Sequence, residues 1–115
     1  MLINRLAASL SAAKPFAQIA DALARGEDAT LATPGLIRPA LVASVYALEP
    51  RPVLVVLAGE ESGERFWRQT ASLLDRSRVL HLPDRADMPW SDTAPDLAVV
   101  GARSHALYAL DKNRP

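Results

Sequence analysis

The sequence contains no cysteine, which excludes disulfide scaffolds, thiolate zinc sites and cysteine nucleophiles. It also lacks a charge excess, because 13 Lys and Arg residues balance 13 Asp and Glu residues to a formal net charge of +0. Without a basic field, the chain is poorly suited to hold a phosphate backbone non-specifically. Aromatic residues make up only 5% of the chain and are not interleaved with basic residues, which disfavours a surface for base stacking.

Long apolar runs are missing as well. None approaches the ~20 residues that cross a bilayer. The Ala- and Ser-rich stretch 1–13 is interrupted by Asn4 and Arg5, which makes it too polar for a secretory signal. We therefore expect a cytoplasmic protein with no membrane contact. With 115 residues, 50% of them hydrophobic, the chain can build one small domain or a part of a larger one.

The most informative stretch is the short apolar run at residues 52–58, which is closed by Gly59. Three of its residues are valine, and no polar residue alternates with the apolar ones. A strand with one solvated face would alternate, whereas a strand covered on both faces need not. The run therefore predicts a central parallel strand between helices. A buried helix is the competing interpretation, but the run is short and rich in β-branched residues.

The rest of the chain predicts an α/β order around this strand. Apolar residues at helical spacing, with caps and proline or glycine stops, predict five helices: from Leu2, from Pro15 to a stop at Gly26, from Arg38 to Leu48, from Glu60 to about Asp75, and from Thr93 to Leu110. Residues 29–33 and 78–82 are the other candidate strands. Alternating strands and helices imply a three-layer fold, with a short parallel sheet and flanking helices.

This order divides the chain into an N-terminal helical segment, residues 1–28, and a partial α/β domain, residues 29–115. Three strands make a thin sheet for such a fold. The chain also ends just after a helix, where another strand is expected. The sequence is therefore expected to be a truncated fragment.

A strand, a glycine-containing turn and a helix are the layout of a phosphate-binding loop, which reads Gly, four residues, Gly, Lys and then Ser or Thr. The aligned positions here read Ala32, Thr33, Pro34, Gly35, Leu36, Ile37, Arg38 and Pro39. Ile37 would crowd a phosphate, and Pro39 supplies neither a hydroxyl for magnesium nor a backbone N–H. Only Gly35 and the cation of Arg38 remain, so the loop is predicted to be degenerate and to bind no nucleotide.

Several short motifs carry a resemblance to a known family. They read RPVLVV at 51–56, LP at 82–83, MPW at 88–90, PD at 95–96, VVGAR at 99–103 and ALYAL at 106–110. In order and spacing they resemble the N-terminal module of the bacterial transcription-repair coupling factors (Mfd), which is itself similar to the first part of the excision-repair protein UvrB. The resemblance runs from Ala32 to Leu110, and the family usually has Leu-Pro-Tyr at the third motif.

The resemblance implies a degenerate P-loop NTPase-like fold of the UvrB domain 1a type, with no ATP hydrolysis in this fragment. ATP and Mg²⁺ are expected only in later modules of a full-length ATP-dependent DNA translocase of the helicase superfamily, and other modules bind DNA and RNA polymerase. The UvrB-like region recruits UvrA in nucleotide excision repair and restrains the translocase modules. The family's UvrA contacts lie mainly in a neighbouring module, so no contact residue is transferred to this sequence.

The resemblance favours a non-catalytic module that acts through protein contacts, and two other interpretations stay open. The chain could be a divergent P-loop or Rossmann-type nucleotide-binding domain, or a free-standing scaffold domain. Its serines form no nucleophile elbow, so acyl transfer has no support.

Candidate metal ligands have simpler explanations. His81 and His105 lie far apart in the sequence and lack a partner at helical spacing, so structural roles are favoured over a metal pair. The acidic group Asp84, Asp87, Asp92 and Asp96 could hold magnesium only if its oxygens converge. Turn and capping roles explain Asp84 and Asp96 without a metal.

The two tryptophans differ in context. Trp67 lies on an apolar face of a predicted helix and is expected in the core. Trp90 follows a proline in a predicted loop and is the candidate for a partner-facing residue, because loops carry much of recognition.

Gly101 lies within the last predicted helix, where glycine costs about 1 kcal/mol relative to alanine. A close approach of this helix to the sheet is the expected reason.

Overall fold

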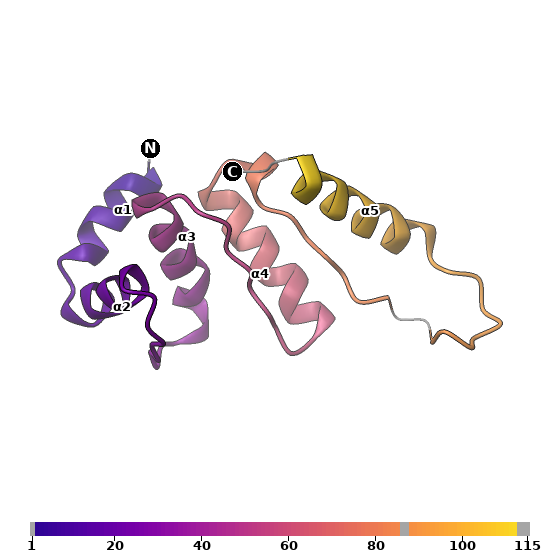
Figure 1. Ribbon diagram of the computed structural model, residues 1–115, viewed down its shortest axis with the longest axis horizontal. Helices are drawn as coiled ribbons and strands as arrows, with labels where there is room; N and C mark the ends of the chain where they lie inside the picture. Colours follow the sequence, from indigo (N-terminus) through magenta and orange to yellow (C-terminus); the bar gives the residue numbers. More distant parts are fainter. Residues whose placement is uncertain (1, 86–87, 113–115) are drawn as a thin grey trace.

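The computed structural model describes residues 2–85 and 88–112, and their regular structure is entirely helical (Figure 1). The elements are α1 (Leu2–Ser11), α2 (Lys14–Ala24), the 3-10 turn η1 (Gly35–Ile37), α3 (Arg38–Leu48), α4 (Glu60–Leu73), the 3-10 turn η2 (Arg76–Arg78) and α5 (Leu97–Lys112). These ranges contain no strand, so the prediction of a three-layer α/β fold with a parallel sheet is wrong. None of these helices is long and apolar enough to cross a membrane.

The predicted central strand, residues 52–58, is an unpaired segment between α3 and α4. Its side chains alternate in exposure: Val53, Val55 and Leu57 are 47%, 39% and 37% exposed, whereas Leu54 and Val56 are 86% and 83% exposed. This period of two is the side-chain alternation of extended backbone. The backbone groups of this segment make no hydrogen bond within the described part of the chain. The segment therefore has the side-chain pattern of a strand but no neighbouring strand.

The other two predicted strands are also absent. Residues 29–33 are irregular, and residues 79–82 are irregular too, after the turn η2 that ends at Arg78. The side chain of Asp75 caps this turn, because its Oδ1 accepts hydrogen bonds from the Ser77 N–H (3.0 Å) and hydroxyl (2.9 Å). The backbone bond, and then the hydroxyl bond, hold the pKa of Asp75 below its ordinary value. A local cap therefore stabilises the tight turn that ends at Arg78, the first residue of the predicted strand.

The helices follow their local signals closely. The prediction of a helix from Arg38 to Leu48 is confirmed by α3. The predicted stop at Gly26 is confirmed too, since Gly26 has a positive φ of 71°. Its N–H donates to Leu23 O, and the N–H of Glu27 donates to Ala22 O, which together form a Schellman motif.

The core lies mainly where α1 packs on α3, with α2 against α1 (Figure 1). Its buried residues are Ile3 and Ala7 of α1, Phe16 and Ala22 of α2, and Pro39, Ala43 and Ser44 of α3. On α3, the buried positions carry small residues, whereas Leu41, Val42 and Val45 are only partly buried. The hydroxyl of Ser44 donates to Ala40 O (2.7 Å), so this fully buried group is satisfied within its own helix.

The last helix, α5, begins at Leu97, three residues later than a helix capped by Thr93 would begin. Asp96, not Thr93, is its cap, because Asp96 Oδ1 accepts a hydrogen bond from the Ala98 N–H (2.8 Å). Pro95 explains the shift, since a proline disfavours helical geometry at the residue before it. Gly101 has no atom within 4 Å of where a Cβ would lie, so the predicted close approach at Gly101 is wrong.

Gly26 and Gly101 form a matched pair for an alanine substitution. We expect Gly26→Ala to lower the free energy of unfolding by about 1 kcal/mol, because a side chain is strained at positive φ. Gly101→Ala is expected to raise it by up to about 1 kcal/mol, because alanine is the better helix former and the space is open. Urea unfolding followed by far-UV circular dichroism measures both. Equal shifts of the same sign would contradict the assigned conformations.

Candidate functional site

Of the residues that align with a phosphate-binding loop, Gly35–Ile37 form a 3-10 turn directly before α3. The N–H of Ile37 donates to Pro34 O (3.1 Å), and the N–H of Arg38 donates to Gly35 O. A phosphate cradle needs several backbone N–H groups aimed at one point. Here two of those groups are used within the turn, and Pro34 and Pro39 have none to offer. The turn therefore presents few donors to an anion.

Gly35 and Arg38, the two remnants of the motif, lie on the exposed side of this turn. Gly35 does not have the positive φ that such loops use glycine to reach. The Arg38 guanidinium reaches back to Thr33 O (3.4 Å). Leu36, between them, is 83% exposed. The loop thus presents an apolar side chain and one cation beside it.

Trp90, the predicted partner-facing residue, lies in a tight turn of the loop before α5. The Ser91 N–H donates to Met88 O (2.9 Å), which closes the turn, and the Thr93 N–H donates to Ser91 Oγ (3.2 Å). Trp90 is 79% exposed and Met88 61%. A constrained turn with two large apolar side chains in solvent has the composition of a protein-binding surface, where tryptophan and methionine are enriched.

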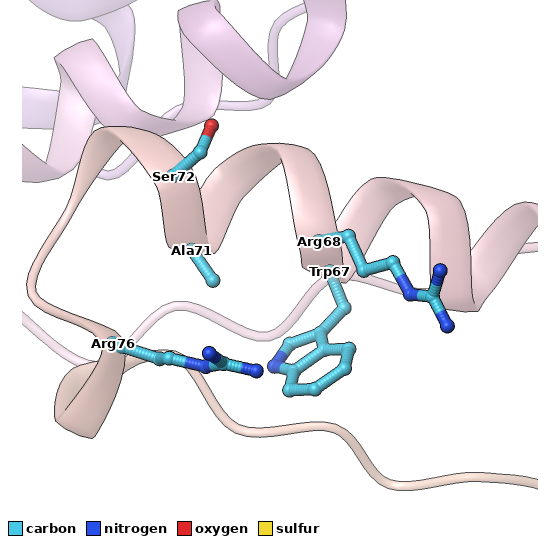
Figure 2. A pocket seen from close by; sticks show the side chains of 5 residues that line it. All are labelled: Trp67, Arg68, Ala71, Ser72 and Arg76. Carbon is cyan, nitrogen blue, oxygen red and sulfur yellow. The ribbon is translucent and has the colours of Figure 1, made fainter.

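A second cluster was not found from the sequence. Trp67 on α4 is half-buried rather than in the core, and its Nε1–H donates to Val79 O (3.0 Å). Its ring stacks on His81, with centroids 5.4 Å apart and an interplanar angle of 17°. The Arg76 guanidinium lies 5.8 Å from the ring centroid, and Figure 2 shows it beside the indole. His81 therefore packs in an aromatic contact.

Glu60, the first residue of α4, binds the segment of residues 79–84 to this helix. Its Oε2 accepts a hydrogen bond from the Asp84 N–H (2.8 Å), and its Oε1 lies 3.5 Å from His81 Nε2. The segment is also held from the side of α5, because Arg103 donates to Pro83 O. No sequence pattern indicates these contacts, because their partners lie 20 to 24 residues apart.

Two shallow hollows on the described part of the surface have polar and apolar lining residues. One, of about 230 Å³, runs along α4 and is lined by Trp67, Arg68, Ala71, Ser72 and Arg76 (Figure 2). The other, of about 350 Å³, lies between α5 and the preceding loop and is lined by Arg85, Pro95, Asp96, Val99, Val100, Arg103, Ser104 and Leu107. Both are open to solvent. The first combines an aromatic ring with two guanidinium groups, and the second is mainly apolar with charged edges.

Candidate metal ligands do not converge among residues 2–85 and 88–112, where no group of three or more His, Asp or Glu side chains could hold an ion. His81 contacts Trp67 and Glu60, whereas His105 is exposed on α5. In the acidic group, Asp96 caps α5, and Asp87 lies outside the described residues.

The described residues thus form a helical domain with many exposed apolar side chains and an exposed tryptophan, Trp90, on a loop. Its sequence is similar to that of a transcription-repair-coupling factor from Myxococcus xanthus, with 31% identity over 105 residues. The match covers 84% of this chain and 9% of that protein. The predicted resemblance to transcription-repair coupling factors is therefore confirmed. No family model matches the chain, and no solved structure is significantly similar to it.

The chain spans only about a tenth of the length of this relative. The similarity therefore relates this chain to one part of a much longer protein, and the activities of that protein need not reside in the matched part.

The bond from Trp67 to Val79 can be tested by substitution. We expect Trp67→Phe to keep an aromatic ring against His81 but to lower the free energy of unfolding by about 1 kcal/mol, because Val79 O loses its donor. Trp90→Phe is the matched control, since Trp90 is 79% exposed, and should change it by less than about 0.5 kcal/mol. Urea unfolding measures both variants. Equal losses would contradict the assigned role of Trp67.

Proposed function

We propose that the chain is a non-catalytic N-terminal module of a transcription-repair coupling protein. In this proposal it belongs to the region that recruits UvrA and restrains the translocase during nucleotide excision repair. The observation that carries the proposal is the similarity to the M. xanthus coupling factor over 84% of the chain. Such a role places the protein in the cytoplasm.

The geometry of the loop before α3 supports the non-catalytic part of the proposal. Its turn uses the N–H groups of Ile37 and Arg38 internally, and Arg38 is directed at Thr33 O. ATP and Mg²⁺ would then belong to other modules of a longer protein, together with the contacts to DNA and RNA polymerase. This module would act through its surface alone.

The turn at Met88–Ser91 supports a docking role. Trp90 projects from a hydrogen-bonded turn, so a partner can bury its ring without first ordering the loop. Tryptophan contributes more than most residues to binding energy at protein interfaces. Trp90 is therefore the residue of this module that we propose to face a partner.

Binding to purified UvrA tests the recruitment part of the proposal. We expect weak but saturable binding of this chain to immobilised UvrA, measured by biolayer interferometry. Trp90→Ala should weaken it by about tenfold or more, as expected for a buried tryptophan anchor. Tyr108→Ala is the control, because Tyr108 is also aromatic and 65% exposed but lies on α5.

Two results would count against this proposal. Absence of saturable binding would contradict recruitment by this module. Equal losses in Trp90→Ala and Tyr108→Ala would contradict the specific role of Trp90.

A thermal titration with Mg-ATP tests whether the loop before α3 binds a nucleotide. We expect no change in Tm, because the turn offers no set of converging donors. A ligand at a hundred times its Kd would stabilise the fold by about 2.7 kcal/mol, which is several degrees for a domain of this size. A rise in Tm that Arg38→Gln abolishes would contradict the proposal and favour a divergent nucleotide-binding domain.

A further inference from the structure

The hollow along α4, here called the Trp67 hollow, has a local excess of positive charge. It is lined by Trp67, Arg68, Ala71, Ser72 and Arg76, so two guanidinium groups and no carboxylate border it. The whole chain, by contrast, has a formal net charge of +0. Electrostatic complementarity therefore favours an anionic group as the occupant of this hollow.

Arg76 is the better placed of the two cations. Within the described part of the chain it makes no ion pair, and its guanidinium carbon lies 5.8 Å from the centroid of the Trp67 ring (Figure 2). A guanidinium held against an aromatic ring keeps its in-plane N–H groups available, and these are the donors that bind a carboxylate in bidentate fashion. Arg76 thus offers a supported site for a carboxylate.

The ring that supports Arg76 is itself held in place. The Nε1–H of Trp67 donates to Val79 O (3.0 Å), and the ring stacks on His81 with centroids 5.4 Å apart. These two contacts orient the indole before any partner arrives. A group that is already ordered loses less conformational entropy on binding, so the orientation of the ring favours association.

The carboxylates near the hollow do not block it. Asp75 precedes Arg76, but its Oδ1 accepts hydrogen bonds from the N–H and the hydroxyl of Ser77. Glu64 pairs with Arg68, and these two side chains are 47% and 71% exposed. Exposed pairs of this kind contribute little to stability. Arg68 can therefore exchange Glu64 for an incoming carboxylate and act as a second cation beside Arg76.

The size and lining of the hollow narrow the class of ligand. Its volume of about 230 Å³ is below the roughly 300–1,000 Å³ of most small-molecule sites, so it suits a side chain better than a nucleotide. Trp67 and Ala71 add apolar surface next to the cations. A free inorganic anion would leave this surface uncovered, whereas an acidic residue beside an apolar one would cover it.

We propose that the Trp67 hollow docks an acidic segment of a partner protein. Arg76 binds a glutamate or aspartate carboxylate of that segment, and the Trp67 ring contacts an apolar neighbour of the acidic residue. Clusters of arginine are a recurrent means of recognising acidic motifs. This role goes beyond the function proposed above, because it does not require the partner to be UvrA.

The fluorescence of Trp67 tests this proposal. The chain contains two tryptophans, so Trp90→Phe leaves Trp67 as the sole reporter. The probe is the capped peptide acetyl-ALEELA-amide, and the matched control is acetyl-ALQQLA-amide. We expect the glutamate peptide to shift the emission saturably to shorter wavelength, because it covers the ring. The glutamine peptide should bind at least about tenfold more weakly, because it lacks the charge.

Substitutions of Arg76 test its role in the same Trp90→Phe chain. Arg76→Gln should raise the Kd for the glutamate peptide by about tenfold or more, and Arg76→Lys by less, because lysine keeps the charge but not the bidentate geometry. Arg5→Gln is the matched control, since Arg5 is an exposed arginine on α1, away from the hollow. It should leave the Kd unchanged, and circular dichroism should show all variants folded.

Several outcomes would overturn the proposal. They are the absence of a saturable shift with the glutamate peptide, equal affinity for the two peptides, and equal losses in Arg76→Gln and Arg5→Gln. Inorganic phosphate that binds as tightly as the glutamate peptide would indicate a small-anion site instead, and tighter binding of oligothymidylate would indicate a nucleic-acid site. None of these results bears on recruitment of UvrA, which is measured separately through Trp90.

Discussion

The contact between α1 and α3 is the constraint on which the rest of the structure depends. The buried face of α3 includes Ala43 and Ser44, and that of α1 includes Ala7, so small side chains let the two helices approach closely. Once they are packed, α2 folds back beneath them, and α4 packs on α3 from the other side (Figure 1). Among the described residues, the extended run 52–58 between α3 and α4 has no neighbouring strand.

Much of the helical structure could be predicted because its causes are local. Gly26 stops α2 through its own φ, and Arg38 and Leu48 bound α3 as the flanking prolines indicate. The lack of a sheet among residues 2–85 and 88–112 could not be predicted in the same way. The run at residues 52–58 does produce alternating exposure, but pairing depends on segments far away in the chain, which local pattern does not determine.

The candidate sites also divide into those with local causes and those that depend on contacts between distant segments. The substitutions at Ile37 and Pro39 indicated a degenerate loop from the sequence alone, and the short turn before α3 is compatible with that reading. The cluster of Glu60, Trp67 and His81 could not be foreseen, because its members meet only after α4 has packed beside the following segment. A helical period placed Trp67 on an apolar face, but its indole N–H bond depends on the position of Val79.

The few contacts of α5 have a consequence for how this helix separates from the other helices. This helix takes no part in the main helix packing, and it is joined to the body through the Arg103 bond to Pro83 O and through the buried Ala106. Its few contacts with the other helices predict that it undocks at a lower free energy than that of global unfolding. We therefore expect the C-terminal helix to open while the first four helices stay assembled.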